Sequence, residues 1–119
     1  MVVPVDRIAE FLSYTHDLGV KYGVDIRSFG HAGDGNLHIY CGANGMDIDT
    51  FREKAEKVMI DSYAKCAELK GQVSGEHGIG HAKKDYLRES VGETAIDLMA
   101  GIKQVFDPKG ILNPGKICS

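Results

Sequence analysis

Glycine and histidine are concentrated in two short windows of this chain, residues 30–45 and 71–80. Nine of the 15 glycines fall inside these windows, and four of the five histidines fall in or beside them. Glycine loses more conformational freedom on folding than any other residue, so it is favoured where the backbone turns tightly or approaches another group closely. The windows therefore predict two crowded loops that bring imidazole side chains together.

The spacing of apolar residues outside the windows predicts the secondary structure. Apolar residues three and four positions apart indicate amphipathic helices, and alternation indicates strands. Glycine after a helix and proline beyond it mark where helices end, as at Gly23, Gly71 and Pro108. The expected elements are helices over residues 6–22, 50–70 and 90–107, strands over residues 24–29, 37–41 and 72–74, and a helical turn over residues 83–88.

This order is that of a β-α-β-β-α-β unit without its first strand. It predicts an α+β, ferredoxin-like fold with the first strand missing, in which an antiparallel sheet carries helices on one face. All 119 residues are expected to form a single domain, because this length suits one hydrophobic core. The strand over residues 37–41 would lie beside the absent strand, so we expect an unpaired edge that recruits a second copy into a homo-oligomer.

Charge and cysteine content argue against several functional classes. The net charge is −3 and the lysines are scattered among glutamates, which argues against a nucleic-acid partner. We recognise neither an apolar run of about 18 residues nor a signal peptide, so we expect a cytoplasmic protein without a membrane span. The three cysteines are widely spaced, which suits free thiols better than disulfides or a cysteine zinc site.

The first window predicts a hairpin that pairs two histidines. Asp34-Gly35 lies between two strand-like runs, a strong signal for a two-residue type I′ turn. With these residues at the turn, His31 lies directly opposite His38. Directly paired residues hold their Cβ atoms about 4.5–5.5 Å apart, which lets two imidazoles bind one divalent ion. Glu76 of the second window is the expected third ligand, because a carboxylate commonly completes such a set.

His77 is a candidate general base because it follows Glu76 directly. Beside a bound ion it could accept a proton from a polarised substrate oxygen, a division of labour that suits α-hydroxy acids. The spacing alone leaves open that the hairpin histidines are ordinary surface residues. His16 and His81 are expected to face solvent or to bind a backbone group.

Three ordered motifs resemble the C-terminal domain of the FAD-linked oxidases. The motifs are Gly30-His-Ala-Gly-Asp-Gly-Asn-Leu-His38, Ser74-Gly-Glu-His-Gly-Ile-Gly80 and Phe106-Asp-Pro-Lys-Gly-Ile-Leu-Asn-Pro-Gly-Lys116. The resemblance extends over residues 5–117. The family includes the glycolate oxidase D subunit, D-lactate dehydrogenases and D-2-hydroxyglutarate dehydrogenase.

The resemblance implies roles for individual residues. His31, His38 and Glu76 match the family's ligands of a divalent ion, commonly zinc or manganese. His77 matches the base that takes the α-hydroxyl proton while hydride passes to FAD. The closing motif implies that Asn113 and Lys116 lie near the flavin ring, which makes them candidate cofactor-binding residues. The family's FAD-binding domain is not in this sequence, so we do not expect the chain alone to bind FAD tightly.

These observations lead to one main hypothesis and two alternatives. The chain is expected to be the metal-binding substrate domain of a flavin-dependent 2-hydroxy acid dehydrogenase or oxidase. Its partners would be a 2-hydroxy acid and an FAD-binding domain or subunit. One alternative is a structural module, or a subunit of a split enzyme, that has lost the chemistry. The other is a free-standing metal-dependent hydrolase with His77 as its base.

Overall fold

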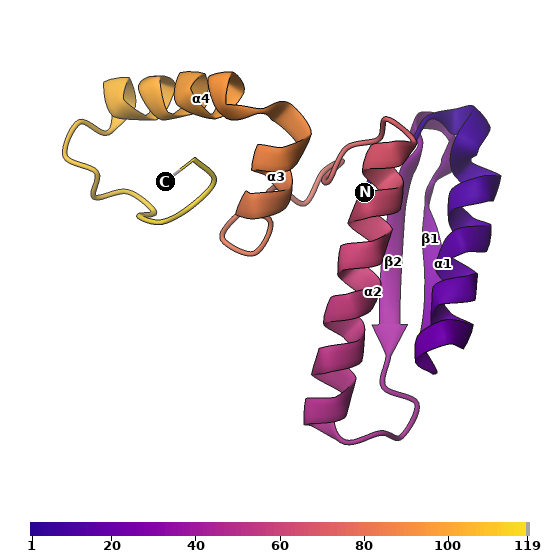
Figure 1. Ribbon diagram of the computed structural model, residues 1–119. Coiled ribbons are helices and arrows are strands. Elements are labelled where there is room, and N and C mark those ends of the chain that lie inside the picture. The colour runs from indigo at the N-terminus through magenta and orange to yellow at the C-terminus, as the bar shows by residue number, and fades with distance from the viewer. Residues whose placement is uncertain (119) are drawn as a thin grey trace. The chain divides into compact units, whose positions relative to one another are not determined.

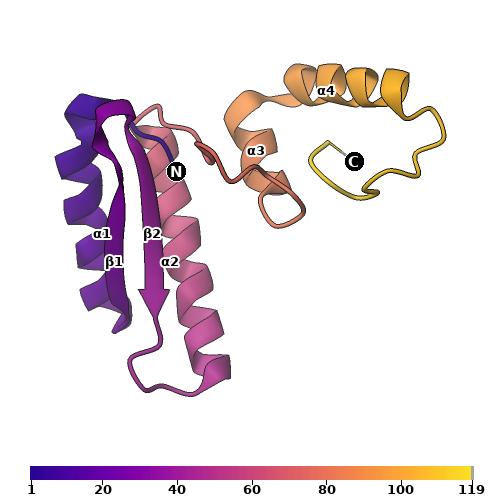
Figure 2. The same ribbon diagram turned by 180° about the vertical axis from the view of Figure 1, so that it is seen from behind.

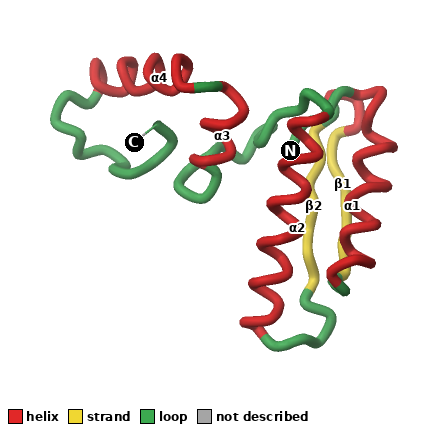
Figure 3. Tube along the Cα trace, viewed as in Figure 1, coloured by secondary structure: helices red, strands yellow, loops and turns green. Residues whose placement is uncertain are grey.

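The protein divides into two compact units, Met1–Glu76 and His77–Ser119 (Figure 1). The structure, a computed structural model, describes residues 1–118. Within these residues, no helix has both the length and the apolar character needed to cross a membrane. The assignment of the whole chain to one domain stays a prediction. The elements in chain order are η1 (Val5–Arg7), α1 (Ile8–Tyr22), β1 (Asp25–His31), η2 (Ala32–Asp34), β2 (Asn36–Gly42), α2 (Ile48–Glu68), α3 (Lys84–Val91) and α4 (Glu93–Phe106), with loops between and after them (Figure 3).

In the first unit, α1 and α2 cover the same face of the β1–β2 hairpin (Figure 2). Leu37 of β2 packs with Phe11 of α1 and Cys66 of α2. Ile26 and Cys41, which pair with each other across the strands, pack in a second cluster with residues of both helices. The strand residues that alternate with them point to the opposite face of the hairpin, which neither α1 nor α2 covers; we call it the open face. The predicted α+β class, with helices on one face, is confirmed.

The three cysteines carry free thiols, as the sequence predicts. Burial raises the pKa of the Cys41 and Cys66 thiols, so both stay protonated at neutral pH. Cys66 Sγ donates a weak hydrogen bond to Val2 O at 3.4 Å. This thiol therefore belongs to the packing around the N-terminal segment.

Residues 1–3 occupy the place that the missing strand would have in the sheet. Val2 forms isolated antiparallel bridges with Asn36 on one side and with Gln72 on the other. Val2 N donates to Gln72 O at 2.9 Å, and Gln72 N donates to Val2 O at 2.7 Å. The sheet itself has two strands. The strand predicted over residues 72–74 is therefore reduced to a single bridge.

The edge of β2 that was expected to be unpaired is covered where the strand begins. Met1 N donates to Leu37 O at 2.9 Å, and Leu37 N donates to Met1 O at 2.8 Å. Val3 N donates to Gly35 O at 3.0 Å. The prediction of an open edge is therefore wrong at Leu37. Within residues 1–118, no further strand extends this cover along β2.

The hairpin turn is longer than the predicted two-residue turn. The 3-10 turn η2 and the left-handed Gly35 (φ 74°) connect the strands. As a result His31 pairs with Asn36, so the predicted direct pairing of His31 with His38 is wrong. The physical reason lies in Asp34, whose Oδ1 accepts a hydrogen bond from Asn36 N at 3.3 Å and so closes the turn with its side chain.

The end of α2 shows why residue 71 is glycine. The helix ends at Glu68, and the left-handed residue that follows is Lys70 (φ 59°), not Gly71 as predicted. A Cβ atom on Gly71 would lie 2.4 Å from Val2 O and 2.6 Å from Cys66 Sγ. Gly71 is therefore required for close approach to the N-terminal segment rather than for helix termination.

Gly71→Ala is expected to destabilise the first unit by about 1–3 kcal/mol, the usual cost of forcing extra volume into a packed site. Urea unfolding measures the change. Gly33→Ala is the matched control, because a Cβ atom at Gly33 meets nothing within 4 Å. The control is expected to stay within about 0.5 kcal/mol of the wild type. Equal stability of the two variants would contradict this account of Gly71.

Candidate metal centre

The open face of the hairpin carries the two histidines of the first window. His31 pairs with Asn36 and His38 pairs with Phe29, so the two histidines are diagonal neighbours on one face. Long side chains at diagonal positions can still reach each other. The centroids of the two imidazoles are 6.2 Å apart. The longer turn thus replaces the predicted direct pair by a diagonal pair.

Glu76 reaches these histidines because Gly75 lies against the start of β2. A Cβ atom on Gly75 would lie 2.4 Å from Asn36 Oδ1 and 2.7 Å from Val2 Cγ2. Only a residue without a side chain can bring the backbone this close. Glu76 follows at once, and its Oε1 lies 2.9 Å from His38 Nε2.

His31, His38 and Glu76 form a cluster of three ligand-type side chains. One ligand atom from each lies within 4.8 Å of the other two, and this is the only such group of three within residues 1–118. Ligands of zinc lie about 2.0–2.2 Å from the ion, so two of them are at most roughly 4.4 Å apart. A small rotation of one side chain would therefore let all three bind one ion. The ion would then replace the direct contact between His38 and Glu76.

The cluster is accessible from solvent. The side chain of His38 is only 12% exposed, but that of Glu76 is 47% exposed, and His31 is exposed as well. Catalytic zinc sites commonly use three protein ligands and leave one position for water or substrate, whereas structural sites are closed by four. The geometry therefore resembles a catalytic site more than a structural one.

His77 directly follows Glu76 and begins the second compact unit. His77 is exposed. The role of His77 as a base beside the cluster stays a prediction.

Asn113 and Lys116 line one groove of the second unit, with a volume of about 550 Å³. The structure therefore brings together the two residues that the resemblance implied for FAD, and their contact with FAD stays a prediction. Most other lining residues are apolar side chains from α4 and from the loop after it. These apolar residues include Met99, Ile102, Phe106, Leu112 and Ile117.

Asp107 organises the loop that carries Asn113, a role that was not predicted from the sequence. Its carboxylate accepts hydrogen bonds from Ile111 N at 3.1 Å and Leu112 N at 2.9 Å and is paired with Lys103. The Lys103 side chain, and then the Leu112 and Ile111 amides, hold the pKa of Asp107 below its usual range. The sequence signal was present, since aspartate between a helix end and proline commonly binds backbone amides.

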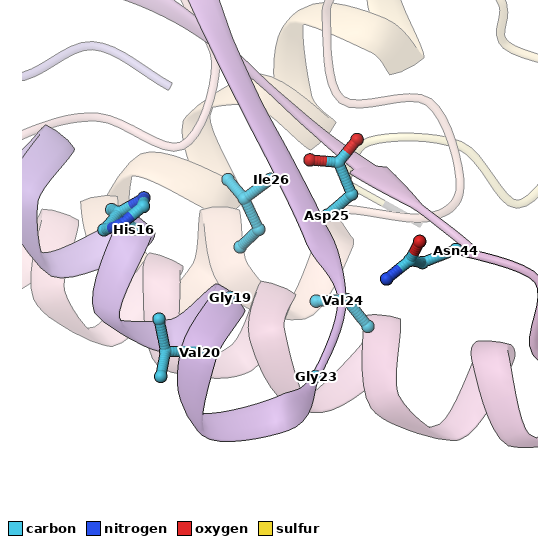
Figure 4. A pocket seen from close by; sticks show the side chains of 8 residues that line it. All are labelled: His16, Gly19, Val20, Gly23, Val24, Asp25, Ile26 and Asn44. Carbon is cyan, nitrogen blue, oxygen red and sulfur yellow. The ribbon is translucent and has the colours of Figure 1, made fainter.

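His16 and His81 lie outside the cluster, as predicted from the sequence. His16 lines a separate pocket of about 270 Å³ near the end of α1 and the start of β1 (Figure 4). Asp25, the carboxylate in that pocket, pairs with Arg27 at 2.9 Å. His81 Nδ1 lies 3.2 Å from Gly115 O. His81 therefore bonds the backbone of the C-terminal loop.

Comparison with known proteins confirms the resemblance that the motifs indicate. Residues 1–117 match the family described as FAD linked oxidases, C-terminal domain. The chain belongs to this family.

Three relatives illustrate the similarity. The chain is 53% identical to a D-lactate dehydrogenase of Anaerostipes hadrus, over 99% of this chain and 25% of that protein. It is 41% identical to the glycolate oxidase subunit GlcD of Bacillus subtilis (strain 168), over 97% of this chain and 24% of that protein. It is 44% identical to a D-2-hydroxyglutarate dehydrogenase of Stutzerimonas stutzeri (strain A1501), over 97% and 25%. The chain therefore spans about a quarter of the length of the curated relatives it matches.

Asp107→Asn is expected to loosen the loop that carries Asn113, because the amide has one acceptor oxygen where the carboxylate has two. Amide hydrogen exchange of Ile111 and Leu112 should become several-fold faster. In the wild type, the carboxylate's contribution is present above the ordinary aspartate pKa of about 3.9 and is lost as pH falls through the lower pKa of the folded state. Asp97→Asn, an exposed change on α4, is the control. Unchanged exchange in Asp107→Asn would contradict this role.

Proposed function

We propose that this chain is the metal-holding part of the substrate domain of a flavin-dependent 2-hydroxy acid dehydrogenase or oxidase. The observation that carries the proposal is the convergence of His31, His38 and Glu76 on the open face of the hairpin. Two imidazoles and one carboxylate suit zinc or manganese. The names of the relatives, D-lactate dehydrogenase, glycolate oxidase and D-2-hydroxyglutarate dehydrogenase, support a 2-hydroxy acid as the substrate class.

The proposed chemistry assigns one task to each group. A divalent ion held by the three ligands would act as a Lewis acid on a substrate oxygen. His77 would accept the α-hydroxyl proton at an imidazole nitrogen, a role that its position directly after Glu76 supports. In the full-length enzyme FAD would accept the hydride from the α-carbon, so that the hydroxy acid would lose two electrons and become a 2-oxo acid.

The groove with Asn113 and Lys116 is the proposed approach to FAD. Its apolar wall offers a surface for a flat ring, and the amide and the ammonium are donors for ring carbonyl oxygens. Because the chain spans about a quarter of its relatives, we place the main FAD-binding residues outside it. We therefore expect the chain alone neither to bind FAD tightly nor to turn over substrate.

Assembly into a homo-oligomer stays a prediction, as does a cytoplasmic location. Within residues 1–118, β1 is the only strand that pairs along β2, and sheet edges without a neighbouring strand recruit other chains, which supports self-association. Light scattering at high protein concentration should give a mass of at least two chains. A monodisperse monomer would contradict the prediction.

The metal site is tested by the metal content of protein purified without a histidine tag. We expect about one zinc or manganese ion per chain by elemental analysis. Calorimetric titration of the metal-free protein with Zn²⁺ or Mn²⁺ should show binding. His31→Ala, His38→Ala and Glu76→Gln each remove a direct ligand. Each should weaken binding at least about 100-fold, more than the roughly 10–100-fold that loss of a ligand's neighbour costs.

His16→Ala is the matched control, since it removes an imidazole outside the cluster. It should bind the ion as the wild type does. Equal metal content in the wild type and the three ligand variants would overturn the proposed site. Such a result would favour the structural-module alternative.

A further inference from the structure

Phe29 covers one face of the His38 imidazole. The two residues are direct partners across the strands. Their rings stack with centroids 5.4 Å apart and planes 18° apart, which is the geometry of an offset-stacked aromatic pair. This contact helps to explain why His38 is only 12% exposed on a face that neither α1 nor α2 covers.

Tyr40 packs against Phe29 on the same face. Their ring centroids are 5.0 Å apart and their planes differ by 12°. Tyr40 pairs with Arg27, so it lies diagonally from Phe29. Phe29 therefore stacks on two rings, and both stacks restrict the rotation of its side chain.

Phe29 contributes little to the core of the unit. It is 59% exposed and lies on the opposite side of β1 from the residues that pack under the helices. Phe29 therefore acts chiefly through its ring contacts on the open face.

We infer that Phe29 is a positioning residue for the metal site: it fixes the plane of the His38 ring so that Nε2 points toward Glu76 and the ion. This inference rests on the proposed function. Glu76 Oε1, at 2.9 Å, contacts the edge of the ring, while Phe29 holds its face. A ligand that is already oriented loses less conformational freedom when the ion binds, so the ion binds more tightly.

The test compares Phe29→Leu with Phe29→Tyr. Leucine is apolar but has no flat ring, whereas tyrosine keeps the stack. Calorimetric titration with Zn²⁺ should show about tenfold weaker binding for Phe29→Leu, the lower end of the range for loss of a ligand's neighbour. Phe29→Tyr should bind close to the wild type. Ser28→Ala, next to Phe29 on β1, is the control for general effects on the strand.

A second measurement separates positioning from loss of folding. In the metal-free protein, NMR signals of the His38 ring should be shifted upfield by the Phe29 ring in the wild type and in Phe29→Tyr. In Phe29→Leu this shift should disappear while the backbone signals of α1 and α2 stay in place. If the wild type binds Zn²⁺ and Phe29→Leu binds it equally well, this inference is overturned and the proposed function stands. If the wild type binds neither Zn²⁺ nor Mn²⁺, the proposed function fails, and the role of Phe29 fails with it.

Discussion

The first unit depends on the way residues 1–3 pass between the start of β2 and the segment after α2. The space around these residues is too small for additional side-chain atoms. Val2 is hydrogen-bonded on one side to Gln72 and bridged on the other to Asn36, and the side chain of Val3 lies in the core. A Cβ atom on Gly35 would lie 2.0 Å from Val3 O, and one on Gly71 would lie 2.4 Å from Val2 O. Glycine at both positions is therefore a steric requirement of one backbone passage.

The same passage determines where the third ligand of the candidate metal centre lies. Asn36 is buried between Val2 and Gly75, and Gly75 has no room for a side chain there. Glu76 is thus attached to a backbone that packs directly on the hairpin that carries the histidines. Sites built on packed backbone hold their ligands more accurately than sites on free loops. The concentration of glycine and histidine in the same windows follows from this arrangement: the glycines bring the two backbones together, and the side chains next to them form the cluster.

The elements that were predictable from the sequence are those that carry a periodic or local signal. The helix that ends at Gly23 (φ 67°) and the one that ends before Pro108 both follow such signals. Bridges formed by Val2 carry no such signal, because a single residue has no period and its partners lie far along the chain. The role of Gly71 was misread for the same reason: a glycine after a helix resembles a cap until the segment that crosses it is known.

The error in the hairpin register did not separate the two histidine ligands, and strand geometry explains why. Direct pairing of His31 with His38 and the observed pairing of His31 with Asn36 differ by two residues. Side chains alternate between faces with a period of two, so a shift of two moves a residue along the strand but keeps it on the same face. A shift of one would have sent His38 under the helices. The prediction of a shared face was therefore robust to this error, whereas the prediction of directly opposed Cβ atoms was not. A diagonal pair also leaves the position opposite His38 to another residue, and the aromatic ring of Phe29 occupies it.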